Sequence, residues 1–302
     1  MQKTVVTILS SNFSGSHFLS LILGSHSKAM HIGEIKHLRR VHKSELRYCY
    51  VCEDPERCPV LSGITPETID SAYETIFSNI NDPNIITLID ASKKVSWAKR
   101  FIHHNKYEMK YIHLIRDPRA LVRRWIISDA TWRKRGKIRI KLARSEPPKS
   151  WPLLWLPIIQ VYTYRWLFQN REISRFISEN KLDALLVTYW DLANYSEREV
   201  QRVTKWLGLT YEPSQLDYWN FEHHGTQKAT YEWTKKQKTR YFDKRWQVFF
   251  TKKQQEEIIG HRDVVVYLDN LGLVATDEGL TLRSNISLVE SFNRTNKLTL
   301  AT

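Results

Sequence analysis

The chain has 302 residues, a formal net charge of +14 and an apolar fraction of 42%. This length can bury a substantial core, which favours one large α/β domain. The 11 Trp, 14 Tyr and 11 Phe residues argue against disorder over most of the length. The excess of positive charge indicates an acidic partner, such as a nucleotide, a nucleic acid, a sulfated or phosphorylated substrate, or a membrane surface.

Targeting segments are not evident in the sequence. The N-terminus lacks the charged start, apolar run and small-residue cleavage site of a signal peptide. A run of about eighteen apolar residues, as a membrane span requires, does not occur either. We therefore expect a cytoplasmic protein with no membrane partner.

The first segment, residues 4–34, combines a strand, a polar turn and a helix. Val5 to Leu9 predict a short buried strand, and Phe18 to Leu23 predict an amphipathic helix that ends at Gly24. The turn between them is small and polar, with Ser10, Ser11, Asn12, Ser14, Gly15 and Ser16. Such a turn exposes backbone N–H groups at a helix N-terminus, as phosphate cradles do. Gly15 would let the backbone approach an anion closely.

This turn has two interpretations. Many βα turns carry Ser and Gly and bind nothing. The alternative is an anion site without the lysine and magnesium of an ATPase, since neither GxxxxGK[ST] nor GxGxxG occurs in the chain.

All three cysteines, Cys49, Cys52 and Cys58, lie within ten residues, just after the basic segment 37–43. A CxxC pair can bind zinc with further ligands such as His42. A reduced structural loop is the alternative, and a clear fourth ligand is missing. We therefore expect no required metal, with the three cysteines as the candidate ligands if one is present.

A second strand is predicted at 85–89, after a helix at 65–80 and before a helix at 95–103. Asp90 and Lys93 follow this strand directly. Because ligands of open α/β sheets bind at the carboxyl ends of strands, both are well placed for chemistry.

A third strand, predicted at 109–115, leads into Arg116-Asp117-Pro118-Arg119. Pro118, preceded by an acidic residue, predicts a sharp strand-to-helix turn. Arg116 would then be held at the rim of the sheet, where a phosphate could bind.

The densest basic run, residues 133–144, lies in a predicted insert at about 129–150. A solvated, mobile insert, a lid over an anionic substrate and a nucleic-acid patch are the alternatives. The aromatic region 151–164 could line an acceptor pocket, although a packed core is the more common use of such residues.

The remaining elements follow in chain order. We expect helices at 161–177, 197–206, 252–260 and 264–271, a strand at 182–187, and a polar, mobile tail at 276–302.

Taken together, these motifs resemble the sulfotransferases that use 3′-phosphoadenosine 5′-phosphosulfate as donor. The resemblance rests on Ser14-Gly15-Ser16, on the strand end Asp90-Ala91-Ser92-Lys93 and on Arg116-Asp117-Pro118-Arg119, and it covers about residues 4–272. It implies a three-layer α/β fold around a central parallel sheet, related to nucleotide kinases, with right-handed crossovers. The expected organisation is a single domain over 1–275, with a Cys-bearing insert at about 45–62.

The resemblance also implies the residues that bind the donor. The expected set is Ser14, Gly15, Ser16, His17, Phe18, Arg116, Arg124, Ser128 and Lys228. Phe13 departs from the family, because many relatives carry a lysine or arginine there, so Lys93 and His17 would supply the cation. Arg124 stands where the family places a serine, and Ser128, one helical turn further, could supply the hydroxyl.

Glu34, in the pair Gly33-Glu34, is the predicted catalytic base, because several similar sulfotransferases carry a catalytic glutamate there. Partial burial would raise its pKa toward neutrality, as a general base requires. His17 and His37 are the alternatives, and a salt bridge from Glu34 to Lys36 or Arg39 is the structural interpretation.

The expected function is in-line transfer of a sulfuryl group to a hydroxyl or amine of a small molecule, such as a carbohydrate or natural product. A basic nucleic-acid or polyanion binder is the alternative from another class. A small-molecule kinase on the same fold is disfavoured by the missing phosphate-loop lysine.

Overall fold

The computed structural model describes residues 2–39, 49–226, 228–235 and 242–283. The chain forms two compact units. Unit 1 comprises residues 1–114, 180–187 and 191–241, and unit 2 comprises residues 115–179, 188–190 and 242–302. The expectation of one domain over residues 1–275 stays a prediction.

Unit 1 is organised around a five-stranded sheet with the order β2-β3-β1-β4-β5. β1 pairs in parallel with both β3 and β4, and β3 pairs in parallel with β2. The strands are β1 (Thr4–Ser10), β2 (Ala29–His31), β3 (Thr87–Lys93), β4 (Glu108–Ile115) and β5 (Ala184–Thr188). β1 and β3 are buried along their whole length, as expected for strands covered on both faces.

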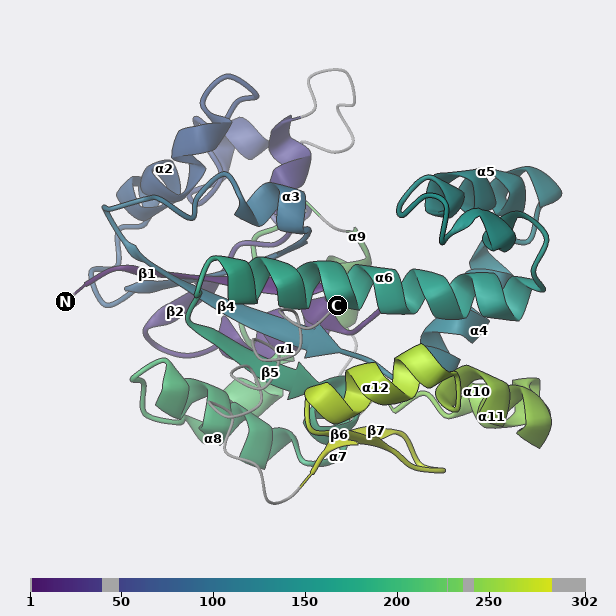
Figure 1. Cartoon of the computed structure of the whole chain (residues 1–302). Coiled ribbons are helices and arrows are strands. Elements are labelled where there is room, and N and C mark those ends of the chain that lie inside the picture. Colours follow the sequence, from purple (N-terminus) through teal and green to yellow (C-terminus); the bar gives the residue numbers. More distant parts are fainter. Residues whose placement is uncertain (1, 40–48, 227, 236–241, 284–302) are drawn as a thin grey trace. The chain divides into compact units, whose positions relative to one another are not determined.

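Helices cover both faces of this sheet. Figure 1 shows α2 (Ala72–Asn79) and α3 (Val95–Ala98) on one side, and α1 (Ser16–Leu23) and α8 (Ser196–Trp206) on the other. Side chains of α2 and α3 form one core cluster with Val5 of β1 and Leu88 of β3. The predicted fold class, an α/β fold with a central parallel sheet between helical layers, is thereby confirmed.

The register of β1 and β3 determines where the polar ends of the two strands meet. Val6 lies opposite Ile89, and after an irregularity Leu9 lies opposite Lys93. The turn after β1 and the end of β3 therefore share one edge of the sheet, the edge where ligands of such folds bind.

The other helical elements of unit 1 are short. They are η1 (Ile35–Arg39), η3 (Pro55–Arg57), η4 (Ile69–Ser71), η6 (Pro213–Asn220) and α9 (Lys228–Thr234), while α7 (Tyr189–Asn194) begins in unit 2 and ends in unit 1.

Unit 2 consists mainly of helices. They are α4 (Pro118–Ser128), α5 (Trp132–Ala143), η5 (Trp151–Leu154), α6 (Ile158–Glu179), α10 (Arg245–Phe249), α11 (Lys252–Ile259) and α12 (Arg262–Asn270), followed by the hairpin β6 (Leu273–Ala275) and β7 (Leu280–Leu282). Asp117 caps α4 by accepting a hydrogen bond from Arg119 N, and Pro118 occupies the first turn, as predicted.

Some predicted boundaries were wrong. The helix expected from residue 65 begins only as η4 and α2, and the helix expected at 95–103 is the single turn α3. β3 extends beyond residue 89 to Lys93. The motif Asp90-Ala91-Ser92-Lys93, which was expected to follow the strand, therefore forms the last part of it. The predicted mobile tail is wrong at its start, because β7 pairs with β6, and its remainder from residue 284 lies outside the described residues.

Most of the basic run at 133–144 lies in the helix α5. The Arg139 guanidinium donates hydrogen bonds to the carbonyls of Leu153 (2.9 Å) and Leu156 (2.6 Å). Leu142 packs in a small apolar cluster with Leu153 and Val161. Buried leucine side chains and arginine–carbonyl bonds hold this helix against its own unit. In the described part of the chain, no helix has the length and apolar character needed to cross a membrane.

Candidate active site

The turn after β1 has the backbone of an anion cradle. Gly15 has φ of 93°, a conformation that favours glycine, and its carbonyl accepts the hydrogen bond from Leu19 N (3.1 Å). Within the described part of the chain, no side chain caps the start of α1, so the first N–H groups of this helix have no side-chain acceptor there. Phe13 also has a positive φ, of 71°, which is strained for a residue with a Cβ and indicates a functional constraint.

Three serine hydroxyls of this turn are buried and have no hydrogen-bond partner among the described residues. They belong to Ser10, Ser11 and Ser14, each at most 2% exposed. A buried polar group without a partner costs about 1–3 kcal/mol. The turn therefore has unused hydrogen-bond donors, and an anion at the helix N-terminus would accept hydrogen bonds from both the hydroxyls and the N–H groups.

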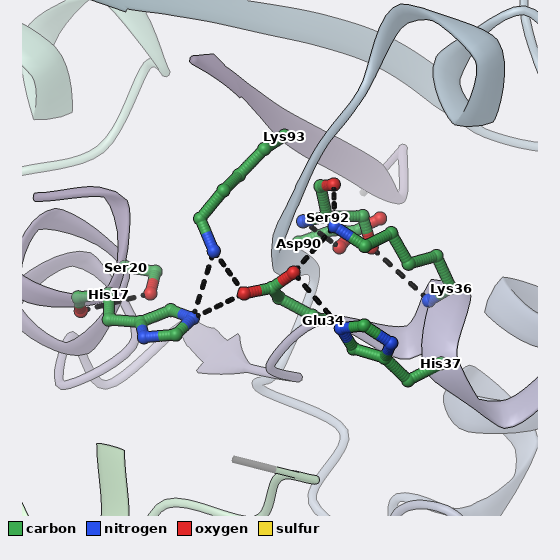
Figure 2. Close-up of polar contacts among 8 residues, drawn as sticks. All are labelled: His17, Ser20, Glu34, Lys36, His37, Asp90, Ser92 and Lys93. Atoms are coloured by element: carbon green, nitrogen blue, oxygen red, sulfur yellow. Dashed lines mark hydrogen bonds and ion pairs between the residues drawn. The ribbon is translucent and has the colours of Figure 1, made fainter. Parts of the chain in front are cut away.

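Directly beside this turn, a single carboxylate is surrounded by four basic side chains (Figure 2). His17 Nε2, on the first turn of α1, lies 2.9 Å from Glu34 Oε1, and Lys93 Nζ donates to the same oxygen. On the other oxygen, Lys36 Nζ lies at 2.5 Å and His37 Nε2 at 3.3 Å. Glu34 is 5% exposed, so this is a buried charge cluster centred on one carboxylate.

The local backbone explains how these side chains meet. Gly33 follows β2 with φ of 70°, and its carbonyl accepts a hydrogen bond from Ala91 N (2.9 Å), which ties Glu34 to the end of β3. Lys93 ends β3 with φ of 67°, an uncommon conformation for a residue with a side chain. The helix η1 then brings Lys36 and His37 back to the same carboxylate.

The electrostatics of the cluster differ from the expectation. Burial alone would raise the pKa of Glu34, but hydrogen bonds from His17 and His37 and the charges of Lys93 and Lys36 hold it well below its usual range. The predicted rise toward neutrality was therefore wrong. Burial and the neighbouring Lys93 charge lower the pKa of His17 to about 4, so its imidazole is neutral at pH 7. Burial also lowers the pKa of Lys93, while Glu34 opposes that shift.

Asp90 does not belong to this cluster. One carboxylate oxygen accepts hydrogen bonds from Tyr73 OH (2.6 Å) and Trp97 Nε1 (2.7 Å), and the other accepts from Ser92 N (2.7 Å). Burial raises the pKa of Asp90 against these hydrogen bonds. Its donors come from the core, which favours a structural role for Asp90, and its expected part in chemistry stays a prediction.

Phe18 and Lys228, the other predicted donor ligands of unit 1, have different surroundings. Phe18 lines a cavity of about 570 Å³ together with Ile22, Tyr195 and Trp219, and the Arg198 side chain also borders it. Lys228 is exposed at the start of α9.

Two of the three predicted ligands of unit 2, Arg116 and Ser128, have partners within that unit. Arg116 pairs with Asp243 (3.3 Å) and stacks over the Tyr189 ring, with 4.3 Å to the ring centroid. Arg124 is exposed on α4. The Ser128 hydroxyl donates to the carbonyl of Trp125 (3.3 Å).

The three cysteines converge on a residue that the sequence reasoning missed. His224 Nδ1 lies 3.7, 3.3 and 3.4 Å from the Sγ atoms of Cys49, Cys52 and Cys58. His42, the ligand suggested from the sequence, lies outside the described residues. A histidine pair such as His223-His224, far along the chain from a CxxC motif, is the sequence signal that could have found this fourth ligand.

The known structures that the chain resembles include two sulfotransferase domains. The sulfotransferase domain from the curacin biosynthetic pathway aligns with 85% of this chain and 96% of its own, at 17% identity and a TM-score of 0.49. The sulfotransferase domain from the Synechococcus PCC 7002 olefin synthase aligns with 99% of this chain and 95% of its own, at 15% identity and a TM-score of 0.48. No family model and no curated protein sequence matches the chain.

Proposed function

We propose that this chain is a sulfotransferase, which moves the sulfuryl group of 3′-phosphoadenosine 5′-phosphosulfate to a hydroxyl or amine of a small-molecule acceptor. The observation that carries the proposal is a juxtaposition within unit 1. The uncapped α1 N-terminus, with its unpartnered serine hydroxyls, leads directly into His17, which contacts the carboxylate of Glu34. The proposed setting is the cytoplasm, and the proposed acceptor is a carbohydrate or natural product.

The turn supplies the grip on the donor. The hydroxyls of Ser14 and Ser16 and the N–H groups of Gly15, Ser16 and His17 form the proposed site for the phosphosulfate. Sulfate and phosphate oxygens are acceptors only, which suits a cradle made of donors. Phe18 and its cavity are the proposed site for the adenosine.

Lys93 is the proposed cation for the leaving group. When the bond between sulfur and the bridging oxygen breaks, negative charge builds on that oxygen, and a preorganised ammonium stabilises it. Lys93 is the last residue of β3, at the edge of the sheet where the turn begins. It would replace the lysine or arginine that many relatives carry at the position of Phe13. No magnesium ion is needed in this scheme.

Glu34 and His17 together are the proposed base. The acceptor oxygen or nitrogen forms a bond to sulfur, adenosine 3′,5′-bisphosphate leaves, and the acceptor proton passes to this pair. In the free protein, burial and the Lys93 charge lower the pKa of His17, while hydrogen bonds from His17 and His37 and the charges of Lys93 and Lys36 lower the pKa of Glu34. An anionic donor beside Lys93 offsets that positive charge and raises the proton affinity of the pair. Because Glu34 and His17 contact each other directly, they titrate as one unit.

Arg116, Arg124, Ser128 and Lys228 are the proposed ligands of the donor's 3′-phosphate, on the strength of their motif positions. A bidentate arginine–phosphate contact is worth about 2–4 kcal/mol when partly buried. Arg116 is oriented by Asp243 and Tyr189, so it carries the larger share of this proposal.

The function is tested by following transfer from ³⁵S-labelled donor to a panel of hydroxyl and amine acceptors. Wild-type protein is expected to label at least one acceptor. Lys93→Met should lower the rate by about 10²–10³-fold, the usual cost of removing one transition-state donor. Lys99→Met, which changes an exposed lysine near α3, is the matched control and should keep the rate. Phosphoryl transfer from ATP with magnesium, in place of sulfuryl transfer, would overturn the proposal in favour of a kinase.

A further inference from the structure

Four potential metal ligands meet in unit 1, away from the Glu34 cluster. They are the sulfur atoms of Cys49, Cys52 and Cys58 and the Nδ1 atom of His224, and these atoms all lie within 4.8 Å of one another. The histidine is 166 to 175 residues from the cysteines along the chain, so the fold brings the set together. All three cysteines are free thiols.

The distances agree with a tetrahedral zinc ion. With Zn–S bonds of about 2.3 Å and Zn–N bonds of about 2.0–2.1 Å, a tetrahedral angle separates sulfur from nitrogen by about 3.6 Å. The observed separations between Sγ and His224 Nδ1 are 3.7, 3.3 and 3.4 Å.

Thiols and imidazole alone do not explain this arrangement. A neutral imidazole nitrogen has one lone pair or one proton, so it can serve one good hydrogen bond and not three. A disulfide would join two of the sulfurs and leave the third facing the same nitrogen. A cation at the centre satisfies all four atoms at once, because zinc binds thiolates and neutral imidazole.

The surroundings of the set are those of a bound metal. Glu222 Oε1 lies 2.9 Å from His224 Nε2, the carboxylate–histidine contact that orients metal-binding imidazoles. Leu61 N donates a hydrogen bond to Cys58 Sγ (3.4 Å), which stabilises a thiolate. Cys49, Cys58 and His224 are buried.

We propose that Cys49, Cys52, Cys58 and His224 form a structural zinc site. Four protein ligands leave no open position for water or substrate, so this zinc supports the fold and does not catalyse.

The proposed zinc site also holds the backbone segment that packs against Gly33, the residue before Glu34. Gly225, which follows the ligand His224, accepts a hydrogen bond from Tyr50 N (3.1 Å) through its carbonyl. Gly225 packs directly on Gly33, where a Cβ would come within 3.2 Å of the Gly225 Cα. Zinc thus holds the 223–226 segment against the residue that precedes Glu34, and His224 acts as a positioning residue for that turn.

The first test is the metal content of the full chain, purified without an affinity tag, kept reduced and dialysed against EDTA. Mass spectrometry of the elements is expected to give about one zinc per chain. A mercurial that blocks thiols should release this zinc as the three thiols react. A chain with three reactive thiols and no zinc, which also binds none when zinc is added, would overturn the proposal.

Ligand variants sharpen the test. His224→Ala should lose the zinc, His224→Cys should keep it with four sulfur ligands, and His103→Ala, an exposed histidine of the same unit, should keep it unchanged. Full zinc content in His224→Ala would contradict the assignment of His224. If His224→Ala does not fold, cobalt exchanged into the wild-type protein decides the matter. Strong visible bands of tetrahedral cobalt with thiolate charge transfer are expected, and the weak bands of octahedral cobalt would refute the site.

The positioning role has its own readout, which does not depend on activity. Amide hydrogen exchange in the segment 31–39 should speed up at least tenfold when zinc is removed, and should not change in His103→Ala. Equal protection with and without zinc would leave the metal site standing and refute its support of Glu34.

Discussion

Two buried carboxylates at the same end of the sheet have opposite surroundings. Among the described residues, the hydrogen-bond donors to Asp90 are neutral groups, namely Tyr73, Trp97 and the Ser92 backbone. Glu34 faces two lysines and two histidines. Burial dominates for Asp90 and raises its pKa, whereas hydrogen bonds and positive charge dominate for Glu34 and lower its pKa.

The different surroundings of the two carboxylates indicate a structural role for Asp90 and a functional role for Glu34. A carboxylate with neutral donors stabilises the core and needs nothing further. Two lysines held by one buried carboxylate leave an excess of positive charge, which an arriving anion can use. Glu34 therefore marks the site where an anionic substrate is expected, and Asp90 marks the support beneath it.

The largest effect expected from this comparison is on turnover. Glu34→Gln removes a member of the proposed base pair, and loss of a general base typically costs about 10²–10⁴-fold. We expect kcat for sulfuryl transfer to fall by that amount, while the Kd for adenosine 3′,5′-bisphosphate, the product formed from the donor, changes little. Near wild-type turnover in Glu34→Gln, with none in His17→Ala, would assign the proton to His17 alone.

Asp90→Asn is the matched change in the other carboxylate. An amide NH₂ would face the donors of Tyr73 and Trp97, or of the Ser92 backbone, and leave a buried donor without an acceptor. The free energy of unfolding should therefore fall by about 1–3 kcal/mol, measured by urea denaturation. The folded variant should keep kcat within a few fold. A loss of turnover as large as that of Glu34→Gln would mean that Asp90 takes part in chemistry.

A pH dependence of stability, similar in size to the effect of Asp90→Asn, is also expected. The pKa of His17 is lowered to about 4 in the folded chain, against about 6.5 in the unfolded chain. Between these values the unfolded chain binds more protons, so stability is full above pH 6.5 and is lost as the pH falls toward 4. The free energy of unfolding that His17 contributes falls by up to about 1.4 kcal/mol per pH unit.

This dependence is measured by urea denaturation between pH 7 and pH 4.5. His17→Asn should have a flatter slope than the wild type, and His103→Asn, an exposed control, should match the wild type. Parallel curves for all three proteins would show that His17 titrates normally in the folded chain.

Much of the fold followed from local patterns in the sequence. β1, α1, β4, α4 and α6 were predicted because apolar runs, Gly15 and Pro118 mark their positions. β2 was missed because a strand of three residues has no periodicity to read. The basic residues of α5 concealed a helix, since its apolar contacts are few and Arg139 binds backbone carbonyls.

The candidate site was predicted in its members but not in its electrostatics. Glu34, His17 and Lys93 were named from motifs, and the structure brings all three together. The sign of the Glu34 pKa shift depends on four side chains from α1, η1 and β3 that reach one carboxylate, which no local pattern encodes. His224 was missed for the same reason, because its partners are more than 160 residues away.

The central claim is tested most directly by calorimetric titration with adenosine 3′,5′-bisphosphate in the absence of magnesium. The account predicts a Kd in the micromolar range or tighter, about −8 kcal/mol. Arg116→Ala should weaken binding well over tenfold, and Arg124→Ser, which restores the family residue, should be far milder. Tighter binding of ATP with magnesium would contradict the account in favour of a kinase. Salt-sensitive binding of polynucleotide, with no response to the bisphosphate, would contradict it in favour of a nucleic-acid binder.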